Sequence, residues 1–156
     1  MKDKRDLKVQ AIENGTVIDH IKAGQALNVL RILGIFTDCK GTVSFVMNAP
    51  GSGGRKDVVK VEGRELNVEE LNRISLISPN ATVNIIRDFE VLQKKKVVLP
   101  TYVEGVVRCT NLNCISNSTE PIKSRFSVVH SEDGGVVLRC LYCEHVISEN
   151  IAENLV

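Results

Sequence analysis

The sequence has no tryptophan, few aromatic residues and no long apolar run. Aromatic residues make up 4% of its 156 residues, so a core must be built from valine, isoleucine and leucine. A surface for stacking nucleic-acid bases would be poor for the same reason. No run approaches the roughly 20 apolar residues that a membrane span needs, and the charged N-terminus has no apolar stretch behind it. These absences predict a cytoplasmic protein with no membrane partner.

The sequence also has no large excess of positive or negative charge. The formal net charge is +1 with 25% charged residues, so nothing global indicates a nucleic-acid binder. Apolar residues make up 43%, which is enough for a packed core and argues against disorder. In a reducing compartment the five cysteines point to metal or redox chemistry rather than to disulfides.

Two helices are predicted in the N-terminal part. The first covers residues 23–33 and stops at Gly34. Its apolar stripe is Ala26, Leu27, Leu30 and Leu33. The second begins at Asn67, where Glu70 completes a capping box, and ends before Pro79. Its buried stripe is Leu71, Ile74 and Ile77 or Leu76.

The remaining N-terminal segments alternate or are rich in β-branched residues, as strands are. The first of these segments is residues 7–12, which is followed by residues 15–18. The others are residues 42–47, 58–62, 82–87 and 90–98. The order β-α-β-β-α-β with an extra strand predicts an α+β fold: a ferredoxin-like antiparallel sheet with two helices on one face. Residues 97–106 are predicted to form an extended linker. The domain boundary therefore falls at about residue 101 and separates domain 1–100 from domain 101–156. Cys39 is interpreted as a small buried residue without a role.

The strongest chemical signal is Cys109-x4-Cys114 followed by Cys140-x2-Cys143. Two such pairs, separated by strands around the turn Asp133-Gly134-Gly135, predict a small all-β four-cysteine zinc-binding domain. Four thiolates close the coordination shell, so one structural Zn²⁺ per chain is expected; a rubredoxin-type iron site is the alternative. His130 and His145 are interpreted as surface or hydrogen-bonded residues.

Polar residues lie where the predicted strands should carry few. Asp19 and His20 follow one strand, Lys60 and Asn84 lie inside two others, and lysines 94–96 end the last. They could form an anion or nucleotide site on the open face of the sheet, although solvated lysines are the plainer interpretation. The glycine-rich segment 50–56 lacks a phosphate-binding motif and is predicted to be a flexible hairpin loop. No catalytic arrangement is found.

Several motifs together resemble one family. They are Gly15-Thr16-Val17-Ile18-Asp19-His20-Ile21, Gly54-Arg55-Lys56-Asp57, Pro79-x-Ala81-Thr82-Val83-Asn84, and the cysteine segments Cys109-x-Asn111-x-Asn113-Cys114 and Cys140-x-Tyr142-Cys143-Glu144. In the same order, over almost the whole chain, they resemble the regulatory chain of aspartate carbamoyltransferase. The resemblance implies a non-catalytic subunit of de novo pyrimidine biosynthesis that binds CTP, UTP and ATP. It also implies that the chain forms regulatory homodimers, and that each zinc domain binds a catalytic chain of a catalytic trimer.

The resemblance further implies site residues. The effector positions would be Val9, Gln10, Ile12, Asp19, His20, Lys60, Asn84, Ile86, Val91 and Lys94. Asn111, Asn113 and Glu144 match positions that contact the catalytic chain. Phe89 stands where a tyrosine is expected, Gln10 where an acidic residue can occur, and Leu141 where a basic one can.

Two other functions would require features that the sequence lacks. A zinc-ribbon nucleic-acid-binding protein would carry a basic stripe and exposed aromatic residues around the cysteines. The C-terminal segment instead carries Glu120, Glu132, Asp133, Glu144, Glu149 and Glu153. An enzyme with a structural zinc would need a polar catalytic cluster, which the sequence does not show.

Overall fold

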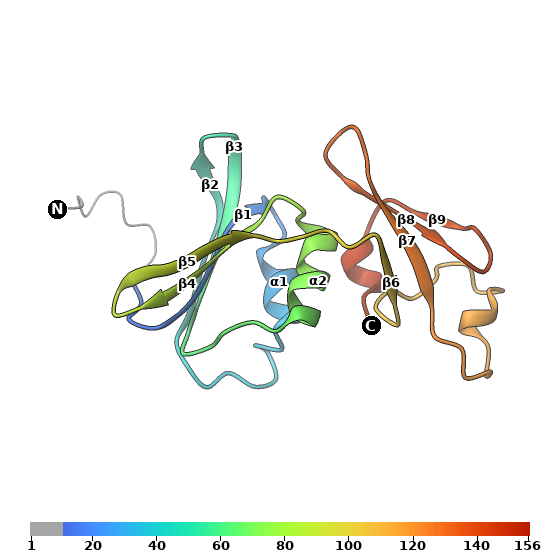
Figure 1. The fold of residues 1–156 in the computed structure, drawn as a ribbon, viewed down its shortest axis with the longest axis horizontal. Coiled ribbons are helices and arrows are strands. Elements are labelled where there is room, and N and C mark those ends of the chain that lie inside the picture. The colour runs from blue at the N-terminus through green and yellow to red at the C-terminus, as the bar shows by residue number, and fades with distance from the viewer. Residues whose placement is uncertain (1–10) are drawn as a thin grey trace. The chain divides into compact units, whose positions relative to one another are not determined.

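The computed structural model describes residues 11–156, so most of the strand predicted over residues 7–12 lies outside the described part of the chain. The chain divides into two compact units, the first ending at Val97 and the second beginning at Val98 (Figure 1). Among the described residues, no helix has the length and apolar character required to span a bilayer.

The first unit is an antiparallel sheet with two helices. Its elements are β1 (Gly15–Lys22), α1 (Ala26–Ile32), β2 (Val43–Gly51), β3 (Gly54–Glu62), α2 (Val68–Ile77), β4 (Thr82–Arg87) and β5 (Glu90–Lys96). The strand order is β2-β3-β1-β4-β5, so β5 is the extra strand beside β4. Both helices lie on the same side of the sheet (Figure 1). The predicted α+β fold is confirmed.

The core of this unit is aliphatic, as the shortage of aromatic residues requires. Side chains of the sheet and the helices that are completely buried there include Ile18, Ile21, Val29, Val59 and Ile74. Alternate residues of the strands point away from the helices, because side chains of a strand alternate between its faces. The sheet therefore has one covered face and one open face.

Helix α2 begins and ends where the sequence predicts. The Asn67 side chain accepts a hydrogen bond from the Glu70 amide at 2.8 Å, and the Glu70 carboxylate accepts one from the Asn67 amide at 3.1 Å. This capping box satisfies two amides that a helix start would leave unpaired. Ile74, Leu76 and Ile77 are buried, whereas Leu71 is only half-buried.

Helix α1 differs from its prediction at one end and on one face. It begins at Ala26 instead of residue 23, but it stops as predicted, because Gly34 has φ +71° and the Ile35 amide donates to the Leu30 carbonyl at 3.1 Å. The prediction that Leu27 belongs to the buried stripe is wrong, because Leu27 is 43% exposed. Leu27 is one position from Ala26 and hence about 100° around the helix. Val29 is buried instead.

Two further predictions in this unit need correction. Cys39 is exposed in the loop between α1 and β2, where its thiol donates to the Gly41 carbonyl at 3.2 Å. Residues 50–56 do form a hairpin, but its loop is shorter than predicted, because β2 runs to Gly51 and β3 starts at Gly54. Proline is tolerated at position 50 because β2 is an edge strand.

The second unit is a small sheet joined by loops. Its elements are β6 (Tyr102–Glu104), the 3₁₀ turn η2 (Ile115–Asn117), β7 (Arg125–His130), β8 (Val136–Cys140), β9 (Val146–Ile147) and the 3₁₀ turn η3 (Ile151–Asn154). The strand order is β6-β7-β8-β9, and β7 and β8 form the predicted hairpin. The predicted linker is shorter than residues 97–106, because Val103 pairs with Phe126 within this sheet.

Candidate metal centre and open sheet face

Two short loops of the second unit carry the four paired cysteines. In the first loop, the Cys114 amide donates to the Asn111 carbonyl at 3.0 Å, which turns the chain back after Cys109. In the second, Cys140 ends β8, its amide donates to the His145 carbonyl, and the Glu144 amide donates to the Cys140 carbonyl, both at 2.9 Å. Both loops are thus fixed by backbone hydrogen bonds.

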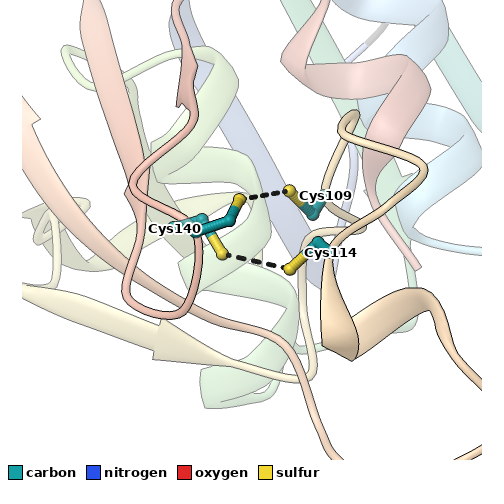
Figure 2. Close-up of side chains that lie close together, drawn as sticks. Cys109, Cys114 and Cys140 are labelled. Carbon is teal, nitrogen blue, oxygen red and sulfur yellow. Dashed lines mark hydrogen bonds between the residues drawn. The ribbon is translucent and has the colours of Figure 1, made fainter.

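The four sulfur atoms form a compact cluster. They all lie within 4.8 Å of one another, with 3.6 Å between Cys109 and Cys143 and 3.7 Å between Cys114 and Cys140. In Figure 2, Cys109 and Cys114 lie together on one side of the cluster, and Cys140 faces them from the other side. A disulfide would need about 2.05 Å. Four sulfurs at about 2.3 Å from a tetrahedral zinc ion would be about 3.8 Å apart. The donor set therefore fits a tetrahedral metal ion.

The thiols differ in their acidity. Burial raises the pKa of Cys109 to about 12 and also raises the pKa of Cys140. The backbone N–H of His145 stabilises the Cys143 thiolate and lowers its pKa to about 7. Two buried thiols of this kind hold their protons at neutral pH unless a cation compensates for the thiolate charge, so metal binding and deprotonation are linked.

Asn117 supports the first loop, and sequence reasoning missed it. Its side-chain amide donates to the Cys109 carbonyl at 2.9 Å and to the Asn111 carbonyl at 2.8 Å. It thereby fixes the loop that presents two of the four thiols, as residues around a metal site often do. In the sequence it stands out only as part of an Asn-x-Ser/Thr triplet, which gives no sign of this role.

The residues expected to contact a partner flank the cysteines. Asn113 and Glu144 are exposed, whereas Asn111 is half-buried and its side-chain oxygen accepts from the Asn113 amide at 3.0 Å. His130 and His145 are also exposed. Asn113, Glu144 and His145 are therefore accessible next to the cluster, whereas His130 pairs with Val136 at the other end of β7.

The open face of the first unit carries a row of four residues across four strands, and three of the four are polar. Lys60 of β3 pairs with Val17 of β1, Val17 pairs with Asn84 of β4, and Asn84 pairs with Lys94 of β5. Directly opposite residues of antiparallel strands project to the same face. Three strand spacings of about 4.8 Å separate Lys60 from Lys94, or about 14 Å. We call Lys60, Val17, Asn84 and Lys94 the lysine row.

An apolar row runs beside the lysine row. Ile86 is buried and pairs with Gly15 on one side and with exposed Val91 on the other. Ile12 is also buried, and the expected positions Val9 and Gln10 lie outside the described residues. A hollow of about 280 Å³ adjoins this row, and its lining includes Gly15, Ile86 and Arg87. Apolar and cationic groups therefore adjoin on one surface.

Asp19 and His20 lie at an irregularity of β1. The pairing of β1 with β3 shifts between Ile18 and Ile21, and His20 has φ +57°. Lys56 Nζ lies 2.9 Å from Asp19 Oδ1, and His20 Nδ1 lies 3.3 Å from Thr82 Oγ1. Partial burial acts to raise the pKa of Asp19, but the hydrogen bonds from Lys56 and the His20 amide, with nearby positive charge, bring it below its usual value. Asp19 is therefore a carboxylate at neutral pH.

Comparison with known proteins matches both units. Residues 7–98 match the family model described as aspartate carbamoyltransferase regulatory chain, allosteric domain. Residues 101–153 match the model described as aspartate carbamoyltransferase regulatory chain, metal binding domain.

Relatives named aspartate carbamoyltransferase regulatory chain are similar to this chain over nearly its full length. The one from Methanosarcina barkeri is 79% identical over 99% of both chains. That from Methanococcoides burtonii is 61% identical over 97% of this chain and 94% of its own, and that from Natronomonas pharaonis is 52% identical over 96% and 95%.

Proposed function

The chain belongs to the family of aspartate carbamoyltransferase regulatory chains, and from this membership we propose that it binds nucleotides and thereby changes the rate of catalytic chains. A member of this family is a non-catalytic subunit with an allosteric and a metal-binding domain. We assign effector binding to residues 1–100 and metal and partner binding to residues 101–156. The lysine row is the observation that carries the assignment.

The open face suits a nucleoside triphosphate such as CTP, UTP or ATP. Lysine ammonium groups bind phosphate oxygens as point charges, and the row offers one at each end. The Asn84 amide can read a base or ribose edge, and the apolar row of Ile86 and Val91 can flank the ring. Asp19 and His20 would lie beside the ribose and phosphates. Val9, Gln10 and Ile12 would complete the base side.

Two adjacent lysines of β5 provide a matched test. Lys94 pairs with Asn84 and faces the open side, whereas Lys95 pairs with buried Val83 and so projects from the other face. We expect Lys94→Ala to weaken CTP binding about 10- to 100-fold, because a charge-assisted hydrogen bond contributes about 1.5–3 kcal/mol. Lys95→Ala removes the same charge and should change binding less than about threefold.

Isothermal titration of the metal-loaded chain with CTP and ATP measures both variants. Equal losses for Lys94→Ala and Lys95→Ala would mean that only the general charge of β5 matters. In that case the lysine row is not the effector site.

We assign the metal as Zn²⁺, one per chain, held by Cys109, Cys114, Cys140 and Cys143. Four thiolates leave no open position for substrate, so the ion has a structural role. It would give the loops a fixed shape with which Asn111, Asn113 and Glu144 contact a catalytic chain. The nucleotide would act by preferring one of two states of the assembly, with a coupling of typically about 1–3 kcal/mol.

We further propose that two copies of the chain pair through the β2 edge. β2 is an edge strand, and Phe45 and Met47 on it are 43% and 40% exposed. Leu27 of α1, which contacts β2 in the same unit, is also 43% exposed. An edge strand with apolar side chains is prone to pair with another chain.

Sedimentation of the metal-loaded chain is expected to give twice the chain mass, and Phe45→Glu should give the monomer mass. Val91→Glu is the control, because it charges the other edge strand at a side chain that is 58% exposed. A dimer that survives Phe45→Glu but not Val91→Glu would place the contact on β5 instead.

A further inference from the structure

Asp57 of β3 is a completely buried carboxylate for which the proposed effector site has no use. Its Oδ2 accepts hydrogen bonds from the amides of Gly24 and Ala26, both at 2.9 Å. Its Oδ1 accepts one from the Asn48 amide at 2.7 Å. A buried carboxylate is costly unless its oxygens are hydrogen-bonded, and here both of them are. One side chain of β3 therefore binds three amides in two other segments, the start of α1 and the strand β2.

Two of these amides, those of Gly24 and Ala26, lie at the start of α1. The helix begins at Ala26, and its N-cap residue Gln25 provides no side-chain cap. The first amides of a helix need acceptors, and a negative charge is stabilising there. Asp57 supplies both from the neighbouring strand. It thereby fixes the turn over residues 22–26, in which Gly24 has φ +96°.

The third amide, that of Asn48, lies at an irregularity of β2. The pairing of β2 with β3 shifts between Val46 and Ala49, and Asn48 there has φ +59°. A shift of this kind leaves an amide without its partner in the sheet. Asp57 accepts from that amide.

The same part of β3 also borders the irregularity of β1 at Asp19 and His20. Asp57 pairs with Ile21, the first residue after the shift, and the preceding residue of β3, Lys56, forms the ion pair with Asp19. Irregularities of this kind redirect side chains and are frequent next to functional sites. If the turn over residues 22–26 were not held, β1 could slip toward regular pairing, and a one-residue slip turns side chains to the opposite face.

We infer that Asp57 is a positioning residue of the effector site, which holds the end of β1 so that Asp19 and His20 face the ligand. This inference rests on the proposed nucleotide site. Asp57 itself is buried against the helix side and does not touch the ligand. Its effect on binding passes through the turn over residues 22–26 and the shifted pairing of β1.

Asp57→Asn tests the inference, because the variant keeps the size of the side chain but replaces one acceptor oxygen by a donor. We expect the Kd for CTP to rise at least about tenfold in the full-length, metal-loaded chain. The control is Thr16→Val, also completely buried, whose hydroxyl donates to the Arg64 carbonyl at 2.6 Å on the helix side of β1. Thr16→Val should lower the Tm to a similar degree but change the Kd less than twofold.

NMR gives a readout that general destabilisation would not move. His20 is the single histidine before residue 130, so its ring resonances report directly on the shifted part of β1. Asp57→Asn should displace them in the absence of ligand, and Thr16→Val should not. This readout needs no nucleotide. A wild-type chain that binds no nucleotide would contradict the proposed function, while the His20 resonances still test the positioning.

A milder variant covers the case in which Asp57→Asn does not fold. Gly24→Ala has room for its Cβ but strains the turn, because φ is +96°. We expect it to raise the Kd for CTP about threefold and to shift the His20 resonances. Gly134→Ala, equally free of contacts at φ +86° in the second unit, should do neither. Wild-type CTP affinity and unshifted His20 resonances in the Asp57 variant, or in Gly24→Ala if that variant alone folds, would overturn the inference.

Discussion

Removal of the metal is expected to unfold the second unit, to abolish assembly with catalytic chains, and to leave nucleotide binding by the first unit intact. The second unit is small, and three of the four cysteines of the cluster, Cys109, Cys114 and Cys140, belong to its buried core. Structural zinc supplies on the order of 10–16 kcal/mol in small modules, more than such a core can replace. The first unit has its own aliphatic core and should remain folded.

Amide NMR spectra measure this outcome well, because the chain has no tryptophan for fluorescence. Excess chelator, or the variant Cys114→Ser, should collapse the dispersed resonances of residues 98–156 while those of the first unit persist. Metal analysis of the untreated chain should give one zinc ion per chain and no iron. Sedimentation with catalytic trimers should show a complex only for the metal-loaded chain.

Cys39→Ser is the matched control, because Cys39 is an exposed cysteine that lies outside the cluster. It should leave metal content, spectra and assembly unchanged. A chelated chain that stays folded and still binds catalytic trimers would show that the metal is not what shapes the docking surface.

The features that could be predicted from the sequence are those that depend on neighbouring residues. The capping box of Asn67 and Glu70 spans one helical turn, and the stop at Gly34 depends on the freedom of one glycine. The cysteine pairs are similar: each is a short loop, and four thiolates have few roles other than metal binding. Short motifs of this kind can form few other structures, so the sequence alone predicts them.

The features that were missed depend on contacts between distant parts of the chain. Asp57 bonds to residues 9, 31 and 33 positions away, so nothing next to it indicates a buried carboxylate. Leu27 and Cys39 are apolar residue types that usually lie inside, and here both are exposed. The type of a residue does not reveal whether a neighbouring strand, or a second copy of the chain, covers its side chain.

The lysine row is an intermediate case. Period-2 alternation places Asn84 and Ile86 on one face, and this follows from the sequence. That Lys60 and Lys94 lie in line with Asn84 depends on the register of three strand pairs, one of which shifts between Ile85 and Ile86. Only the folded sheet fixes such a register.

Phe126→Ala is expected to weaken metal binding although Phe126 is not a ligand. Among residues 11–156, Phe126 has the largest completely buried side chain, and it pairs with Cys140 across β7 and β8. Truncation of a buried phenylalanine typically costs about 3–5 kcal/mol, because it removes apolar contact and leaves a cavity. When a unit folds only as it binds its metal, the free energy of folding is part of the apparent free energy of metal binding. A substitution that destabilises the fold therefore weakens metal binding by the same free energy.

The apparent zinc affinity of Phe126→Ala should therefore fall by roughly two to three orders of magnitude, since about 1.4 kcal/mol corresponds to a factor of ten. Competition with a chromophoric chelator measures this. Tyr102→Ala is the control, because Tyr102 lies in the same sheet with its side chain 58% exposed, and its variant should change the affinity less than about tenfold. Unchanged zinc affinity in Phe126→Ala would mean that the second unit folds before it binds the metal, and the metal would then occupy a shape that the chain already has.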